Sequence, residues 1–278
     1  MTSEWLLVLT RDATASSSNF SVARSFLRHG THHFLSAMYT ELTMTASPSI
    51  NATVVLVHGA WADASSWRSV ISLLQKQGVS VVAVQNPTSS LLADVEATHH
   101  ALNQIDGPVV LAGHSWGGTV ITEAGDDPKV KALVFVAAFA PNVGQSTGDQ
   151  VAAHPAPPGL GEVSTDRSGS YMMSVNGWIN AVAPDLPEQD ARVLAATQPP
   201  LGAGTFADKV SKAAWANRRN WYVISTEDRA VSVELQRELA KKLNARTTEL
   251  KASHMSLLSQ PAAVASAILD AVSEVSVA

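Results

Sequence analysis

A serine between two glycines is the clearest chemical signal in this sequence. Residues 113–117 read Gly-His-Ser-Trp-Gly, the G-x-S-x-G spacing in which a sharp turn from a strand into a helix raises the serine hydroxyl above a sheet. Side chains at Gly113 and Gly117 would collide with neighbouring backbone in such a turn. The run 108–112 before it is apolar and a helical pattern begins at Gly117, so we predict that Ser115 is a nucleophile.

The same spacing recurs at residues 144–148, but there it lacks this context. The second match follows Pro141 and Asn142, stands close to further prolines, and has no strand-like run leading into it. We therefore assign the nucleophile to the first match.

A serine hydroxyl reacts well only when a base takes its proton, and the sequence offers nine histidines. His254 follows the strand-like run 246–251, at the carboxyl edge where sites of α/β sheets gather, and is the predicted base. His58 ends the first strong strand and stays open as an alternative. His114 adjoins the serine, but adjacent residues of a sharp turn point apart, so we do not expect it to reach the hydroxyl.

A catalytic histidine needs a carboxylate that holds its tautomer and stabilises the imidazolium. Glu227 and Asp228 both follow the strand-like run 221–225, and from the residues alone either could serve. With either one, the order along the chain is serine, acid, histidine.

An ester carbonyl under attack develops negative charge on its oxygen, which backbone amides can stabilise. The amide after the nucleophile belongs to Trp116, and the loop after the first strong strand supplies Ala60 as the second donor. Gly59 in that loop lets the backbone approach the substrate. We expect the Ala60 and Trp116 amides to form an oxyanion hole.

The elements that must position these residues alternate regularly. Short apolar runs predict buried strands at 53–57, 79–84, 109–112, 132–137 and 221–224. Helical patterns lie between and after them, at 67–74, 91–105, 117–124, 231–243 and 261–275. Strands that alternate with helices pair in parallel, so the fold class is α/β with a doubly wound, mostly parallel sheet.

Two segments fall outside this alternation. Residues 141–214 are rich in proline, glycine and serine, and we interpret them as a small cap inserted after the strand that ends near Ala138. Residues 1–48 read as an appended segment, poorly ordered or loosely packed, or the product of an upstream start codon, with Met44 as the functional start. An amphipathic targeting helix at 22–34 is the alternative, and 49–278 is the predicted main domain.

Composition excludes several classes of protein. The chain has 278 residues, of which 46% are hydrophobic and 15% charged, a net charge of -5 and no cysteine. This charge attracts neither nucleic acid nor an anionic membrane, and the apolar runs are shorter than the roughly 20 residues that span a bilayer. Without cysteine there is no thiolate nucleophile and no cysteine-bound metal. We expect a cytoplasmic protein that needs no metal and no cofactor, with a homodimer left open.

Taken together, these motifs resemble the α/β-hydrolases, and within them the small bacterial carboxylesterases that are similar to plant methylesterases and hydroxynitrile lyases. The resemblance runs from Thr53 to the C-terminus and rests on residues 55–61, 113–118, 137–141, 222–228 and 253–255. It implies the α/β-hydrolase fold, and it aligns the family's acid on Asp228 rather than Glu227.

The resemblance implies a cofactor-free serine hydrolase that cleaves small, uncharged carboxylic esters through an acyl-enzyme on Ser115. The apolar and small residues that could surround such a substrate are Gly59, Trp61, Trp116, Phe139, Tyr171, Met173, Trp178, Met255 and Leu257. Two alternatives remain, a hydroxynitrile lyase-like activity and a non-catalytic protein that binds a small ligand. In the plant lyases a threonine stands at the position of Gly59 and a lysine at that of Met255, so both residues favour ester hydrolysis.

Overall fold

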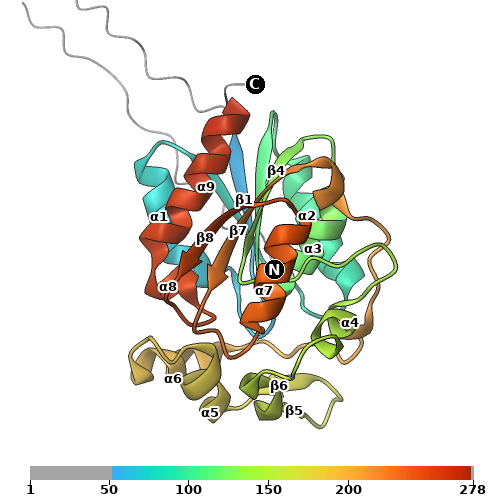
Figure 1. The fold of residues 1–278 in the computed structure, drawn as a ribbon, viewed down its shortest axis with the longest axis vertical. Helices are drawn as coiled ribbons and strands as arrows, with labels where there is room; N and C mark the ends of the chain where they lie inside the picture. The colour runs from blue at the N-terminus through green and yellow to red at the C-terminus, as the bar shows by residue number, and fades with distance from the viewer. Residues whose placement is uncertain (1–51, 277–278) are drawn as a thin grey trace, which may run out of the picture. The chain divides into compact units, whose positions relative to one another are not determined.

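The computed structural model describes residues 52–276 of the chain, and the predicted appended segment 1–48 and the targeting helix at 22–34 lie outside them. Six parallel strands form the central sheet in the order β2-β1-β3-β4-β7-β8 (Figure 1). Their bounds are β1 (Thr53–Val57), β2 (Ser80–Val84), β3 (Val109–His114), β4 (Val130–Val136), β7 (Arg219–Ser225) and β8 (Arg246–Leu250). The chain adds strands outward on both sides of β1 and β3, so the predicted doubly wound α/β fold is confirmed.

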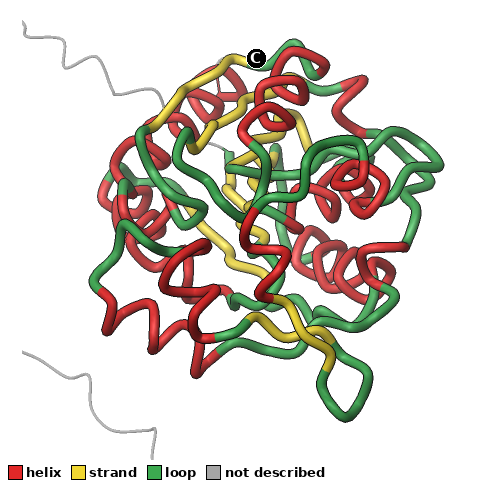
Figure 2. Tube along the Cα trace, turned by 60° about the horizontal axis from the view of Figure 1, so that its bottom comes forward, coloured by secondary structure: helices red, strands yellow, loops and turns green. Residues whose placement is uncertain are grey.

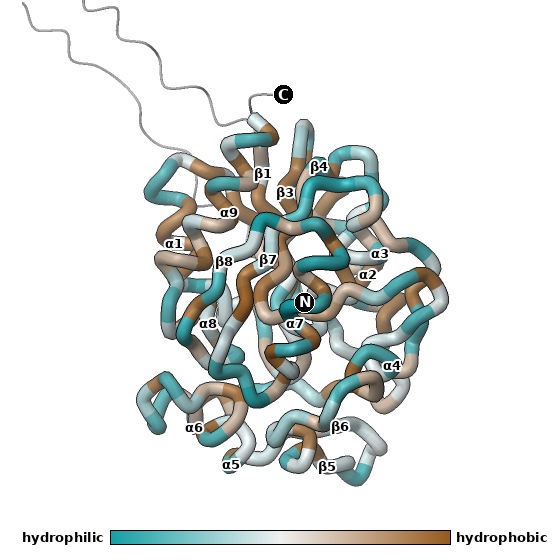
Figure 3. Tube along the Cα trace, in the orientation of Figure 1, coloured by the Kyte–Doolittle hydropathy of each residue, from teal (hydrophilic) through white to brown (hydrophobic). Residues whose placement is uncertain are grey.

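Helices cover both faces of this sheet, because its central strands bury side chains on both sides. Val54 and Leu56 of β1 pack with α1 (Arg68–Lys76), α8 (Ser256–Ser259) and α9 (Pro261–Ser276). Val55 and Val57 point the other way and pack with α2 (Leu91–Asn103), α3 (Trp116–Ala124) and α7 (Val233–Lys242). The result is an apolar sheet between two helical layers, with hydrophilic residues toward the outside (Figure 3).

Helices α2 and α7 begin at serine side chains that accept backbone N–H groups. Ser90 Oγ accepts from the amide of Ala93 at the start of α2, and Ser232 Oγ accepts from Leu235 at the start of α7. The predicted strands and helices are present in the structure, and their ends differ from the predicted ones by a few residues. β3 continues to His114, two residues beyond the prediction, and this extension carries the chain directly into Ser115.

The residues between Pro141 and Ala214 form short elements apart from the main sheet. They comprise α4 (Thr147–Ala152), η2 (Pro158–Glu162), β5 (Val163–Thr165), β6 (Tyr171–Met173), α5 (Val175–Gly177), η3 (Trp178–Val182), α6 (Glu188–Thr197), η4 (Thr205–Ala207) and the start of η5 (Ala214–Asn217). β5 and β6 pair antiparallel as a separate two-stranded sheet. Elements β5, β6, α5 and α6 lie together beyond one end of the central sheet (Figure 1), and Figure 2 turns that end toward the viewer.

None of the helices formed by residues 52–276 is long and apolar enough to cross a membrane.

Candidate active site

Ser115 sits at a strained turn between β3 and α3. Its backbone has φ 52° and ψ -121°, a combination that non-glycine residues rarely adopt. A Cβ atom at Gly113 would lie 2.5 Å from the carbonyl oxygen of Gly117, and one at Gly117 would lie 2.5 Å from that of Val57. Both glycines are therefore required for the turn, as the sequence predicted.

The second G-x-S-x-G match serves a structural purpose. Ser146 Oγ accepts a hydrogen bond from the Asp149 amide at 3.1 Å, and the Asp149 carboxylate accepts one from the Ser146 amide at 2.9 Å. This reciprocal capping box starts α4. The hydroxyl of Ser146 is thus engaged in holding a helix of the cap.

Asp228 and His254 come together from the ends of neighbouring strands. Asp228 follows β7 and His254 follows β8, and His254 Nδ1 lies 2.7 Å from Asp228 Oδ2. The carboxylate fixes the proton on Nδ1, which leaves Nε2 free to accept one from a serine. Glu227, the other acid that the residues allowed, is exposed and lies 3.7 Å from the Lys251 ammonium.

His58, the alternative base, has both ring nitrogens occupied. Its Nδ1 donates to the carbonyl oxygen of Gly59 at 2.8 Å, and its Nε2 accepts from the Asn86 amide at 2.9 Å. Burial lowers the pKa of His58, which keeps the ring neutral in this arrangement. The interpretation of His58 as a base is wrong, because the ring instead ties the loop after β1 to the loop after β2.

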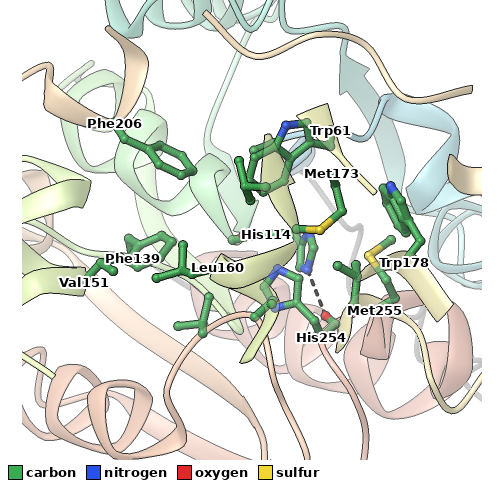
Figure 4. A pocket seen from close by; sticks show the side chains of 17 residues that line it. Trp61, His114, Phe139, Val151, Leu160, Met173, Trp178, Phe206, His254 and Met255 are labelled. Carbon is green, nitrogen blue, oxygen red and sulfur yellow. Dashed lines mark hydrogen bonds between the residues drawn. The ribbon is translucent and has the colours of Figure 1, made fainter. Parts of the chain in front are cut away.

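His114 lies against the base rather than away from the site. Its Nε2 donates to the carbonyl oxygen of His254 at 2.9 Å, and the two ring centroids are 4.6 Å apart (Figure 4). Burial, and secondly the neighbouring charge of His254, hold the pKa of His114 well below its ordinary value. The turn geometry gave no sign of this contact, because it joins residues 140 positions apart.

The two predicted oxyanion donors belong to residues that adjoin Ser115, Ala60 in the pocket and Trp116 along the chain. Ala60 lines the same pocket as Ser115, and the Trp116 amide is in the first turn of α3, where an N–H has no acceptor within the helix.

The Trp116 indole donates to Asp94 Oδ2 at 2.8 Å, and the Thr88 amide donates to Asp94 Oδ1 at 2.7 Å. Burial raises the pKa of Asp94 to about 6. This carboxylate, which the sequence analysis missed, anchors the residue after the nucleophile.

Ser115 and His254 open into an apolar pocket with an empty volume of about 550 Å³ that includes its mouth. Side chains from residues 141–214 and from the loops of the main sheet surround His254 (Figure 4). The predicted residues among them are Ala60, Trp61, Phe139, Met173, Trp178 and Met255. The lining also includes His114, Val151, Gly159, Leu160, Val163, Val182, Phe206, Ala230 and Val231, which the sequence did not assign to the pocket.

Four predicted pocket residues do not line it. Tyr171 faces a neighbouring hollow, and its carbonyl oxygen accepts the Trp61 indole N–H at 2.9 Å. Leu257 is buried in the core beside α9, and the Trp116 side chain is buried on Asp94. Gly59 lies behind the site, where a Cβ would be 2.9 Å from both His114 Nδ1 and Ser115 Cβ.

Among residues 52–276, no group of three or more His, Cys, Asp or Glu side chains could hold a metal ion.

The comparison with protein families agrees with this geometry. The model of the alpha/beta hydrolase family matches residues 54–267, which span the sheet, the elbow, the acid and the base. The chain belongs to the alpha/beta hydrolase family.

Its relatives include several enzymes named as esterases. A carbendazim-hydrolysing esterase of Nocardioides is 33% identical over 115 residues, 34% of this chain and 45% of the relative. A putative chloroplastic methylesterase, number 11 of Arabidopsis thaliana, is 27% identical over 252 residues, 78% of this chain and 63% of the relative. The chain thus spans less than two thirds of the length of either protein.

Polyneuridine aldehyde esterase of Rauvolfia serpentina is 26% identical over 257 residues, which are 78% of this chain and 94% of the relative. A crystal structure of polyneuridine aldehyde esterase superposes with a TM-score of 0.68 at 23% identity, covering 80% of this chain and 99% of the other. The recognised branch, α/β-hydrolases related to plant methylesterases, is confirmed, and the superposition supports the fold.

Proposed function

We propose that this protein is a serine carboxylesterase that cleaves small, uncharged carboxylic esters through an acyl-enzyme on Ser115. The proposal rests on the 2.7 Å hydrogen bond from His254 Nδ1 to Asp228 Oδ2, at a histidine that lines the same apolar pocket as Ser115. A serine, a histidine with its tautomer fixed and a buried carboxylate are the parts that acyl transfer requires. The esterase names of several relatives support the same reaction class.

In the acylation step, His254 Nε2 takes the proton of Ser115 as the hydroxyl oxygen attacks the ester carbonyl. The amides of Ala60 and Trp116 stabilise the oxyanion, and Asp228 stabilises the imidazolium. His254 then gives the proton to the departing alkoxide, and the alcohol leaves while the acyl group stays on Ser115. In deacylation a water molecule loses its proton to His254 and attacks the acyl carbon, which releases the acid and restores Ser115.

The pocket lining supports a compact and uncharged substrate. It includes no lysine, arginine, aspartate or glutamate, so nothing in it would compensate the desolvation of a charged acyl or alcohol group. Trp61, Trp178 and Phe206 offer aromatic surface to a short aliphatic or small cyclic group. We expect short-chain and compact aromatic esters to be preferred over long-chain triglycerides and phosphorylated esters.

Ester hydrolysis is favoured over cyanohydrin cleavage by two residues. Met255 is neutral, so it supplies no cation to hold a departing cyanide beside His254. Gly59 carries no side chain in the tight space next to Ser115. Mandelonitrile cleavage measured beside p-nitrophenyl acetate hydrolysis tests this choice, and cyanide release that depends on Ser115 and exceeds ester turnover would overturn it.

The central test uses a series of p-nitrophenyl esters from acetate to palmitate. We expect activity with an optimum below about ten acyl carbons, and a loss of several orders of magnitude in Ser115→Ala with the fold intact. Rapid fluorophosphonate labelling of Ser115 together with multiple turnovers would exclude a purely ligand-binding protein. Full activity in Ser115→Ala would contradict the mechanism, and an optimum at longer chains would contradict the substrate class.

A further inference from the structure

Gln236 is a buried amide in contact with the candidate catalytic acid. Its Nε2 donates to Asp228 Oδ2 at 2.8 Å, the same oxygen that accepts from His254. The side chain is fully buried in α7, eight residues along the chain from Asp228. An amide placed here acts directly on the oxygen that faces the base.

The side chain of Gln236 is itself held in one orientation. Its Oε1 accepts from the backbone amide of Ser225 at 3.0 Å, and its Nε2 also donates to the carbonyl oxygen of Val231 at 3.2 Å. Ser225 is the last residue of β7, so α7 is fastened to the end of the strand that precedes the acid. Because Oε1 must accept and Nε2 must donate, a flipped amide would lose these bonds, and only a donor faces Asp228.

The carboxylate of Asp228 is fully coordinated when Gln236 is included. Its Oδ1 accepts the backbone amides of Ala230 and Val231 at 2.8 and 2.9 Å, and its Oδ2 accepts His254 Nδ1 and Gln236 Nε2. Four donors match the four lone-pair sites of an ionised carboxylate and leave no site for a proton. The backbone donors fix one oxygen, and Gln236 is the side chain that fixes the other.

We infer that Gln236 is a positioning residue that keeps Asp228 ionised and its Oδ2 directed at His254, and thereby sets the pH range in which His254 acts as a base. This inference rests on the proposed esterase function. A carboxylate that loses one donor becomes more basic and holds the imidazolium more tightly. Loss of the Gln236 amide must therefore move the protonation of the base, in addition to weakening the packing of α7.

The test compares the pH dependence of kcat/KM for p-nitrophenyl acetate in the wild type, Gln236→Leu and Gln150→Leu. Gln150 is the matched control, because it is also buried and both of its amide bonds go to the Ala140 backbone. We expect Gln236→Leu to lose about ten- to hundredfold in kcat/KM at pH 7, the effect of one hydrogen bond to a charged group. Its acidic limb should shift to higher pH, whereas the limb of Gln150→Leu should coincide with that of the wild type.

A second variant covers the case in which Gln236→Leu does not fold. In Gln236→Glu the introduced carboxyl can donate a hydrogen bond to Asp228 only while it holds a proton. When it loses that proton, two buried carboxylates lie side by side and repel each other. We expect activity close to that of the wild type at the acidic end and a new loss as the pH rises. An unshifted acidic limb in Gln236→Leu, or no new alkaline loss in Gln236→Glu, would overturn the inference.

Ser115→Ala measured in parallel separates this inference from the proposed function. If Ser115→Ala abolishes ester hydrolysis while the pH profiles of both Gln236 variants match that of the wild type, the positioning role alone is wrong. If Ser115→Ala stays active, the proposed function itself is wrong.

Discussion

The ring of His114 lies 4.6 Å from the ring of His254, and its Nε2 donates to the carbonyl oxygen of His254 at 2.9 Å. The residue before Ser115, the proposed nucleophile, therefore contacts the backbone and the side chain of His254, the proposed base. This contact fixes the distance between the end of β3 and the loop after β8, the two segments whose side chains must meet for proton transfer.

The first prediction concerns this contact. We expect His114→Leu to reduce kcat for p-nitrophenyl acetate about tenfold with little change in KM, because it removes one hydrogen bond that positions the base. Steady-state kinetics measure the effect. His100→Leu, at an exposed position of α2, is the matched control and should leave kcat unchanged. Equal effects of the two substitutions would contradict the positioning of His254 by His114.

The second prediction concerns the pH dependence of stability that arises from Asp94. The pKa of Asp94 is raised from 3.8 to about 6, so the folded state holds a proton that the unfolded chain has released. The contribution is present in full below about pH 4 and is lost as the pH rises through 6, and its size is about 3 kcal/mol. Urea unfolding of the wild type and Asp94→Asn between pH 4 and 7 should show this decline only in the wild type. If the free energy of unfolding falls in parallel with pH in both proteins, Asp94 is not the source of the decline.

The third prediction concerns the space beside Ser115. A Cβ at Gly59 would lie 2.9 Å from both Ser115 Cβ and His114 Nδ1, so we expect Gly59→Ala to displace the nucleophile and reduce kcat/KM at least tenfold. Gly161→Ala is the control, because a Cβ there would meet no atom within 4 Å. Ester kinetics of both variants measure the effect. Unchanged turnover in Gly59→Ala would mean that the loop after β1 yields easily.

The fourth prediction concerns substrate size. Trp178 is almost fully buried and lines the pocket, so Trp178→Leu should enlarge the acyl space. We expect the ratio of kcat/KM for p-nitrophenyl hexanoate to that for acetate to rise about tenfold, which corresponds to about two newly buried methylenes at about 0.8 kcal/mol each. Trp215→Leu, at a tryptophan outside the pocket lining, should leave the ratio as it is. A ratio that stays constant in both variants would mean that the acyl group does not bind against Trp178.

The sheet and the reacting groups followed from local signals in the sequence. Buried strands read as apolar runs, capped helices follow them, and the glycines at 113 and 117 are demanded by atoms within a few residues of Ser115 or in the adjacent strand. The carboxyl ends of parallel strands share one edge, so residues placed just after β7 and β8 had to lie near the elbow. That is why Ser115 and His254 could be predicted before the fold was known, whereas the choice of Asp228 over Glu227 came from the resemblance to the α/β-hydrolases.

Only the tertiary structure determined which residues position and support this site. The sequence favoured His254 as the base and left His58 as an alternative, and only the bonds of His58 to Gly59 and Asn86 remove it. No motif signals the supporting contacts of Gln236, Asp94 and His114, because their partners lie 8, 22 and 140 positions away and the contacts depend on how helices and loops pack. Other cap residues that line the pocket, such as Leu160 and Phe206, were equally hidden, since a side chain in an irregular segment has no period that fixes its direction.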